Sequence, residues 1–190
     1  MNNYCTYLDI PFPLFNNNID PFQFPKIRHV KLDKLEILST EIQEWFTSLN
    51  LDIMLIEVFY TPPNEITVIH FDSVGGNYTK LNWQFGGAGS IMHWYSANAP
   101  QAHTKTTTPI GSNSAIFKST DVTKIHSQTI QNPSLVQVGI PHNIENFDED
   151  RWVVSVVFRY PNTKFLRPTW SASLKIFNEY LATRRGIEPR

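Results

Sequence analysis

The sequence predicts a mainly β domain, either a sandwich or a jelly-roll barrel, with a helix on each side of it along the chain. Between residues 51 and 160, eight short runs rich in β-branched and aromatic residues are separated by Pro, Gly and Asn turns. The connections between these runs are too short to hold crossover helices, which favours antiparallel pairing. Before and after this region, apolar residues recur at the three- and four-residue steps of a helix.

The first 50 residues are expected to form an extended arm followed by one helix. Prolines break helices and favour an extended segment laid over a hydrophobic surface, and the arm contains four of them: Pro11, Pro13, Pro21 and Pro25. Apolar residues then follow helical spacing over residues 34–49. Asp33 or Ser39 could cap the start of this helix.

The β-rich region, residues 51–160, is expected to form the core of the domain. Its runs are DIMLIEVFY, EITVIHFD, TKLNWQF, SIMHWYS, SAIFKS, TKIHSQT, LVQVGI and RWVVSVVFR. The C-terminal segment, residues 161–190, again has helical spacing, over residues 170–185, and Gly186 provides a stop.

The composition fits one domain that spans residues 1–190. The chain is 41% hydrophobic, which supports one sizeable core. Its 16 Lys and Arg balance 17 Asp and Glu without a long run of like charge, which argues against a nucleic-acid partner. The lone cysteine, Cys5, has no internal disulfide partner and the first residues lack a secretion signal, so a cytoplasmic location is expected. No apolar stretch approaches the ~20 residues that span a membrane, so no membrane association is expected.

Two residues at the end of the run EITVIHFD suggest a metal site. His70 and Asp72 are separated only by Phe71, so their side chains leave a strand on the same face. A distant second histidine would complete the two-histidine, one-carboxylate set of non-haem Fe(II) oxygenases, which leaves positions open for substrate and dioxygen. His142 is the best candidate, because it follows the run LVQVGI shortly before the last strand. The His-X-Asp pattern is common by itself and gains its force from this context.

The last predicted strand offers an anion-binding site. Alternation along RWVVSVVFR places Arg151 and Ser155 on one face, and Arg151 lies nine positions after His142. A guanidinium supplies a bidentate donor pair for a carboxylate, and a hydroxyl can assist it. The alternative is that Arg151 is a surface charge that pairs with the acidic turn 148–150.

Two further residues are weaker candidates for the same site. In TKLNWQF, Lys80, Asn82 and Gln84 share one face, and Asn82 could hold a carboxylate if that face looks into the site. The alternative is a solvent-exposed face, with Lys80 in particular at the surface. Tyr60 is a candidate as well, although tyrosines in strands are usually core residues with a satisfied hydroxyl.

The segments HFDSVGGNYTKLNW and PHNIENFDEDRWVVSVVF resemble the two signature regions of the 2-oxoglutarate/Fe(II)-dependent dioxygenase superfamily, over about residues 57–160. The resemblance is closest to the aspartyl/asparaginyl β-hydroxylase-like and prolyl-hydroxylase-like branches. It implies a double-stranded β-helix, the cupin-like jelly roll. It also implies that iron is bound by three residues and 2-oxoglutarate by four: His70, Asp72 and His142 for the metal, and Arg151, Ser155, Asn82 and Tyr60 for the cosubstrate.

The reaction implied by the resemblance is hydroxylation of an amino-acid side chain, a peptide or a small metabolite. Fe(II), 2-oxoglutarate and dioxygen would take part, with ascorbate as an optional reductant, and succinate and carbon dioxide would be released. The flanks contain no recognised substrate-binding element, so neither the substrate nor the oligomeric state is predicted. Two alternatives remain open: a cupin-type metalloenzyme that does not use 2-oxoglutarate, and a non-catalytic β-sandwich binding module in which His70 and Asp72 are structural.

Overall fold

Two antiparallel sheets, each of six strands, make up the fold in the computed structural model, which describes residues 4–16, 18–72, 78–99, 103–108, 113–130 and 133–182. The first sheet has the order β1 (Cys5–Tyr7), β10 (Ser134–Gln137), β5 (Thr79–Gly86), β12 (Arg151–Arg159), β3 (Asp52–Thr61) and β2 (His29–Leu32). The second has the order β7 (Thr104–Thr107), β8 (Asn113–Phe117), β4 (Ile69–Phe71), β11 (His142–Glu145), β6 (Ile91–Ala97) and β9 (Val122–Thr129).

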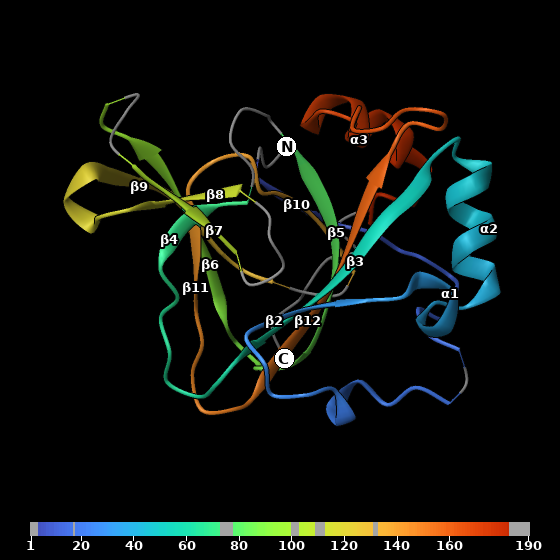
Figure 1. The fold of residues 1–190 in the computed structure, drawn as a ribbon, viewed down its shortest axis with the longest axis horizontal. Coiled ribbons are helices and arrows are strands. Elements are labelled where there is room, and N and C mark those ends of the chain that lie inside the picture. Colours follow the sequence, from blue (N-terminus) through green and yellow to red (C-terminus); the bar gives the residue numbers. More distant parts are fainter. Residues whose placement is uncertain are drawn as a thin grey trace.

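The path of the chain between the sheets is that of a jelly roll. From β3 onward the chain passes from the first sheet to the second at β4, returns at β5 and crosses again at β6; β9 stays in the second sheet, and β10, β11 and β12 then alternate. Figure 1 shows β3, β5 and β12 running together, with β4, β6 and β11 on the other side. Two sheets linked in this way define a jelly roll, so the predicted fold class is confirmed.

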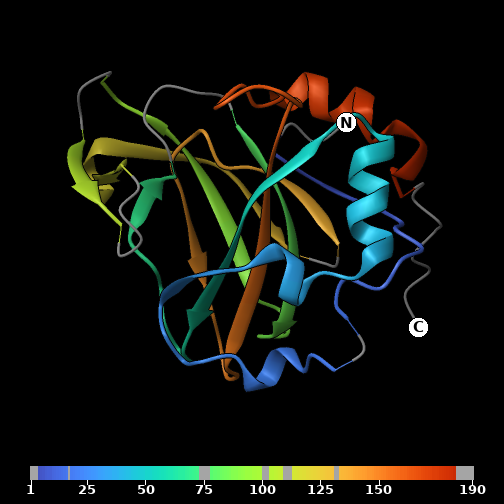
Figure 2. The ribbon, with the colours of Figure 1, turned by 45° about the vertical axis from the view of Figure 1, so that its right-hand side comes forward.

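The helices cover the outer face of the first sheet. They are α1 (Lys34–Ile37), α2 (Thr40–Ser48) and α3 (Trp170–Ile176), and Figure 2 shows α2 and α3 on the same side of the molecule. The apolar residues that alternate along β12 pack with α2 and with Phe177, as seen for Phe158 and Phe46, whose ring centroids are 5.9 Å apart. The inner face of the same strands is therefore left to face the second sheet.

The predicted single helix over residues 34–49 is wrong, because the chain forms two helices there. Ser39 interrupts them with an extended backbone, at φ −60° and ψ 153°. Its hydroxyl accepts a hydrogen bond from the Ile42 amide and donates one to the Pro13 carbonyl, so it caps α2 and ties the arm to it. The proposed Ser39 cap is thus confirmed, but for the second helix only.

The C-terminal helix is shorter than predicted. The α3 helix begins after the Thr169 cap and ends at Ile176, and a short 3-10 turn, Asn178–Tyr180, follows. The predicted stop at Gly186 lies outside the described residues. Among those residues, no helix is long and apolar enough to cross a membrane.

Strands at both edges of the first sheet come from the predicted extended arm. The β1 strand pairs with β10, and β2 pairs with β3. These strands were not predicted, and neither were β7 and β11. The β11 strand matters most for the site. His142 is its first residue, whereas the sequence pattern predicted that His142 lies between two strands.

Candidate metal centre

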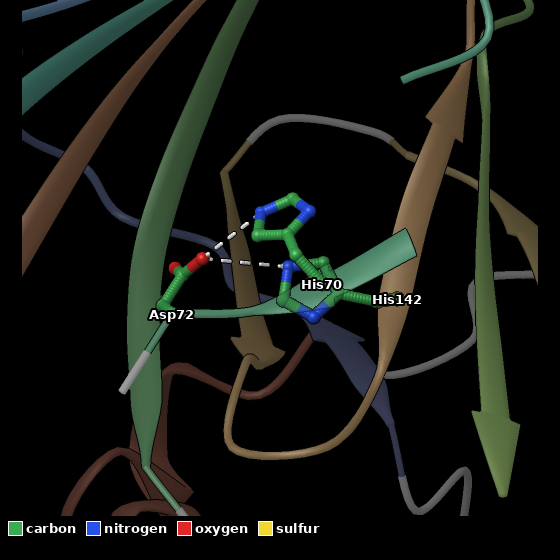
Figure 3. Close-up of side chains that lie close together, drawn as sticks. All are labelled: His70, Asp72 and His142. Atoms are coloured by element: carbon green, nitrogen blue, oxygen red, sulfur yellow. Dashed lines mark ion pairs between the residues drawn. The ribbon is translucent and has the colours of Figure 1, made fainter. Parts of the chain in front are cut away.

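The two histidines of the predicted metal site face each other across a strand pair. The β11 strand lies between β4 and β6, and its register places His142 directly opposite His70. Residues opposite each other in an antiparallel pair project from the same face of the sheet, so the two imidazoles are neighbours, with ring centroids 4.7 Å apart. Asp72 follows β4 immediately and joins them (Figure 3).

The donor atoms of the three side chains converge. Asp72 Oδ1 lies 3.2 Å from His70 Nε2 and 3.7 Å from His142 Nε2. One nitrogen or oxygen atom from each residue lies within 4.8 Å of the other two. The predicted two-histidine, one-carboxylate set is therefore assembled at one point.

Backbone carbonyls fix the orientation of both imidazoles. His70 Nδ1 donates to the Val68 carbonyl at 2.9 Å, and His142 Nδ1 donates to the Ile140 carbonyl at 2.8 Å. A carbonyl oxygen only accepts, so each ring carries its proton on Nδ1 and turns Nε2 toward Asp72. Metal-binding histidines are typically oriented in this way, and the three residues fit a divalent cation.

The protonation states of Asp72 and His142 suit the same role. Burial alone would raise the pKa of Asp72, but the Lys80 ammonium and the two imidazoles hold it well below its usual value. Burial and the neighbouring His70 lower the pKa of His142 to about 4. Burial opposes protonation of His70, yet the bond to Asp72 outweighs it and raises the pKa of His70. Asp72 is thus ionised and His142 neutral near pH 7, the forms that bind metals.

A buried lysine and glutamate stand behind Asp72, and sequence reasoning missed both roles. Lys80 is 4% exposed, and its Nζ lies 2.6 Å from Asp72 Oδ2 and 2.6 Å from Glu57 Oε2. The alternative that Lys80 lies at the surface is wrong, because two carboxylates neutralise it between the sheets. One signal was present: Glu57 is a charged residue in the middle of an otherwise apolar strand, a position that requires a buried partner.

A cavity of about 510 Å³ brings the predicted site residues together. Its walls come from both sheets, and all seven predicted residues line it: Tyr60, His70, Asp72, Asn82, His142, Arg151 and Ser155. Much of the remaining wall is apolar, from Phe59, Met92, Ile130, Val138, Ile144 and Val153. The cavity therefore combines a candidate metal-binding group with a largely apolar enclosure.

Arg151 is a buried cation in this cavity wall. It is 4% exposed, and its Nε donates to Gln84 Oε1 at 2.9 Å and to Ser90 Oγ at 3.1 Å. No carboxylate of the described residues forms an ion pair with it, and burial lowers its pKa to about 9. Arg151 does not pair with the acidic turn at residues 148–150, which was the alternative. Asp150 of that turn pairs with Lys26 instead.

The other three predicted cosubstrate residues are engaged with protein groups. Ser155 lies opposite Asn82, and its hydroxyl donates to Asn82 Oδ1 at 2.7 Å. The Tyr60 hydroxyl donates to the Asp150 carboxylate at 2.6 Å, and its ring packs against Trp152. The Ser155 proton is thus used on the cavity wall by Asn82, and Tyr60 is held by the turn before β12.

Comparisons with known proteins add little to this geometry. The sequence matches no protein-family model and no curated protein. A solved structure of oxalate decarboxylase aligns at 11% identity and a TM-score of 0.31, over 80% of this chain and 33% of that chain. Pumpkin seed globulin aligns at 13% identity and a TM-score of 0.32, over 69% of this chain and 31% of that chain. The chain thus spans about a third of each, and TM-scores this low do not bear on fold or function.

Proposed function

We propose that this protein is an Fe(II)- and 2-oxoglutarate-dependent oxygenase that hydroxylates an amino-acid side chain, a peptide or a small metabolite. The observation that carries the proposal is the buried Arg151 guanidinium, which has no anionic partner among the described residues and shares a cavity with His70, Asp72 and His142. A buried cation is costly unless an anion neutralises it. A cosubstrate carboxylate is the natural partner for its bidentate donor pair.

Charge balance in the cavity favours a dianionic cosubstrate. The positive charges of Lys80 and Arg151 cancel the negative charges of Asp72 and of Glu57, which lies behind Lys80. The other two charged residues of the cavity wall, Arg28 and Glu65, pair with each other. A divalent ion on the three ligands would leave two positive charges in a cavity whose wall is largely apolar. 2-Oxoglutarate carries two carboxylates and would restore neutrality, with its keto and adjacent carboxylate oxygens near the metal and its far carboxylate at Arg151.

The chain's own residues have three tasks in this proposal. His70, Asp72 and His142 would hold the iron from one side and leave the opposite positions open. Arg151 would orient the cosubstrate, and the apolar wall, which includes Phe59 and Ile144, would keep water from the site. When bound, the iron and 2-oxoglutarate would supply the oxidising chemistry, in which dioxygen is consumed and succinate and carbon dioxide are formed.

A metalloenzyme that does not use 2-oxoglutarate is the second candidate. The hydrogen bond between Ser155 and Asn82 favours it, because the Ser155 hydroxyl, which was expected to assist in binding the cosubstrate, already donates its one proton to Asn82 Oδ1. In this alternative the metal would act on its substrate directly, and Arg151 would bind an anionic group of that substrate. Both candidates share the metal centre and differ in the cosubstrate.

Uncoupled turnover separates the two. Succinate formation from 2-oxoglutarate is followed with Fe(II), ascorbate and air in the wild type, Arg151→Met and Arg159→Met. Arg159 is a matched control, because it lies on the same strand but is partly exposed and pairs with Asp52. We expect turnover in the wild type and Arg159→Met, and a loss of at least tenfold in Arg151→Met. Metal binding without any succinate formation would support the second candidate instead.

A further inference from the structure

We propose that Lys80 is a positioning residue that confines Asp72 to binding the metal through one oxygen atom, and that Glu57 and His29 hold Lys80 in place. This inference rests on the proposed metal centre but is independent of the cosubstrate. It assigns a role to three buried residues, Lys80, Glu57 and His29, that the proposed reaction does not otherwise use.

The two oxygens of Asp72 face different partners. Oδ1 lies 3.2 Å from His70 Nε2 and 3.7 Å from His142 Nε2, so it points to the place where a metal would lie. Oδ2 lies 2.6 Å from Lys80 Nζ, a charge-assisted hydrogen bond. The carboxylate is therefore divided between the metal position and the ammonium.

The ammonium itself is fixed by its surroundings. Besides Asp72, Lys80 Nζ contacts Glu57 Oε2 at 2.6 Å and lies 5.2 Å from the centroid of the Phe59 ring. Two carboxylates and an aromatic face enclose an ammonium that has three donor hydrogens. The Lys80 ammonium is therefore held at one position in the cavity and can keep Asp72 Oδ2 in place.

Glu57 is held in turn by the edge strand of the sheet. Its Oε1 lies 3.0 Å from His29 Nε2, and the His29 ring stacks on Phe59 at 4.3 Å between centroids and 21° between planes. His29 and Glu57 are both buried, at 9% and 4% exposure. A continuous series of contacts thus links His29 on β2, Glu57 on β3 and Lys80 on β5 to Asp72.

The bond from Lys80 to Asp72 affects how many coordination positions of a bound metal stay open. A carboxylate with both oxygens free can bind a cation through two bonds, and the second bond would take a position needed by other ligands. Lys80 occupies Oδ2 and so prevents this. The three protein ligands would then take three positions of a six-coordinate ion and leave three open.

Water-proton relaxation of the Mn(II)-loaded protein tests this, because it reports the number of exchangeable waters on the metal. The full chain is loaded with Mn(II) without 2-oxoglutarate. In Lys80→Met, we expect Asp72 to bind through both oxygens, so that relaxation per bound Mn(II) falls by about a third, from three open positions to two. Glu57→Gln removes a charge from the same cluster but keeps a side-chain oxygen that can accept from Lys80 Nζ, so Lys80 should stay paired with Asp72 and the wild-type value should be kept. Lys26→Met removes an exposed Lys–Asp ion pair elsewhere and should also keep it.

Wild-type relaxation in a folded Lys80→Met protein would overturn the positioning role and leave the metal centre standing. A crystal structure of the wild-type Mn(II) complex tests the same point without any variant. It should place one Asp72 oxygen on the metal and the other on Lys80 Nζ, and two Asp72 oxygens on the metal would overturn the proposal. If the wild type binds no Mn(II), the metal centre fails, and the positioning role fails with it.

Discussion

His142 lies directly opposite His70 in the pairing of β11 with β4, and each imidazole donates its Nδ1 proton to the backbone carbonyl two residues before it. The same local bond at two paired positions turns both Nε2 atoms to one side, where Asp72 Oδ1 meets them. Backbone geometry thus arranges the candidate ligands before a metal binds, which lowers the ordering cost of binding.

Loss of either histidine should remove metal binding. We expect His70→Ala and His142→Ala to weaken Co(II) affinity by at least about 100-fold, because removal of a ligand should cost at least as much as removal of a group that only orients one. Anaerobic titration of each variant with Co(II), followed by absorbance, measures this. His126→Ala is the matched control, because His126 lies on β9 outside the ligand group. Equal affinity of His142→Ala and the wild type would contradict the ligand assignment.

Replacement of Arg151 should stabilise the protein while it impairs cosubstrate binding. Arg151→Met removes a buried cation, and its neighbours Ser90 and Gln84 remain hydrogen-bonded to each other at 3.1 Å. We expect a gain of about 1 kcal/mol in the free energy of unfolding without ligand. Thermal unfolding of the metal-loaded protein, with and without 2-oxoglutarate, checks this. The wild type should be stabilised by 2-oxoglutarate and Arg151→Met should not; equal stabilisation of both proteins would refute the clamp.

Acid should destabilise the metal-free protein through the buried carboxylates. The pKa of Glu57 is lowered from 4.5 in spite of burial, because Lys80 and His29 outweigh it, and the pKa of Asp72 lies well below 3.8. A carboxyl group with a lowered folded-state pKa stabilises the fold above its unfolded-state pKa, and that contribution is lost as pH falls through the folded-state value. Stability should therefore begin to fall below about pH 6.5, because His142, with a folded-state pKa of about 4, stays neutral in the fold while the unfolded chain protonates it, and it should fall further below about pH 4.5, where the unfolded chain also protonates the two carboxyl groups.

Urea unfolding in EDTA across this pH range measures the effect. Glu57→Gln should be less stable than the wild type at pH 7 and should lose less stability on acidification, since one of the titrating groups is gone. An identical pH dependence in both proteins would show that the Glu57 carboxylate is not stabilised by Lys80.

A substitution on the helix-covered face of the first sheet should lower the stability of the fold without changing metal binding at the site. Phe177 is fully buried among Trp45, Phe46 and Phe158, on the side of the sheet opposite the cavity. We expect Phe177→Ala to cost about 3–5 kcal/mol of unfolding free energy. Co(II) affinity of the folded variant, measured below its unfolding temperature, should stay within about twofold of the wild type. A large loss of affinity would show that the two faces are coupled.

The features of this fold that depend on side-chain alternation within one strand could be predicted from the sequence. Alternation along β12 separates the core-facing Trp152 and Phe158 from Arg151 and Ser155, and the structure has this separation. The pair of His70 and Asp72 could be predicted for the same reason, because side chains two residues apart on a strand lie on the same face.

The parts that depend on pairing between distant strands could not be predicted in this way. The β11 strand is four residues long, too short for a periodic signal, and its place between β4 and β6 is what sets His142 opposite His70. Lys80 and Glu57 meet because β5 and β3 both pair with β12, a fact of the sheet order and not of local spacing. A single residue, Ser39, divided the predicted helix because its hydroxyl donates to the Pro13 carbonyl and its amide to the Leu14 carbonyl of the arm, and these bonds outweigh the helical pattern.

Calorimetric titration of 2-oxoglutarate under anaerobic conditions tests the central claim most directly, because the metal centre and the Arg151 clamp must act together. The account predicts binding to the Mn(II)-loaded wild type, and at least tenfold weaker binding to the metal-free protein, to His70→Ala and to Arg151→Met. Binding that is independent of the metal and of Arg151, or no binding to the Mn(II)-loaded wild type, would contradict it.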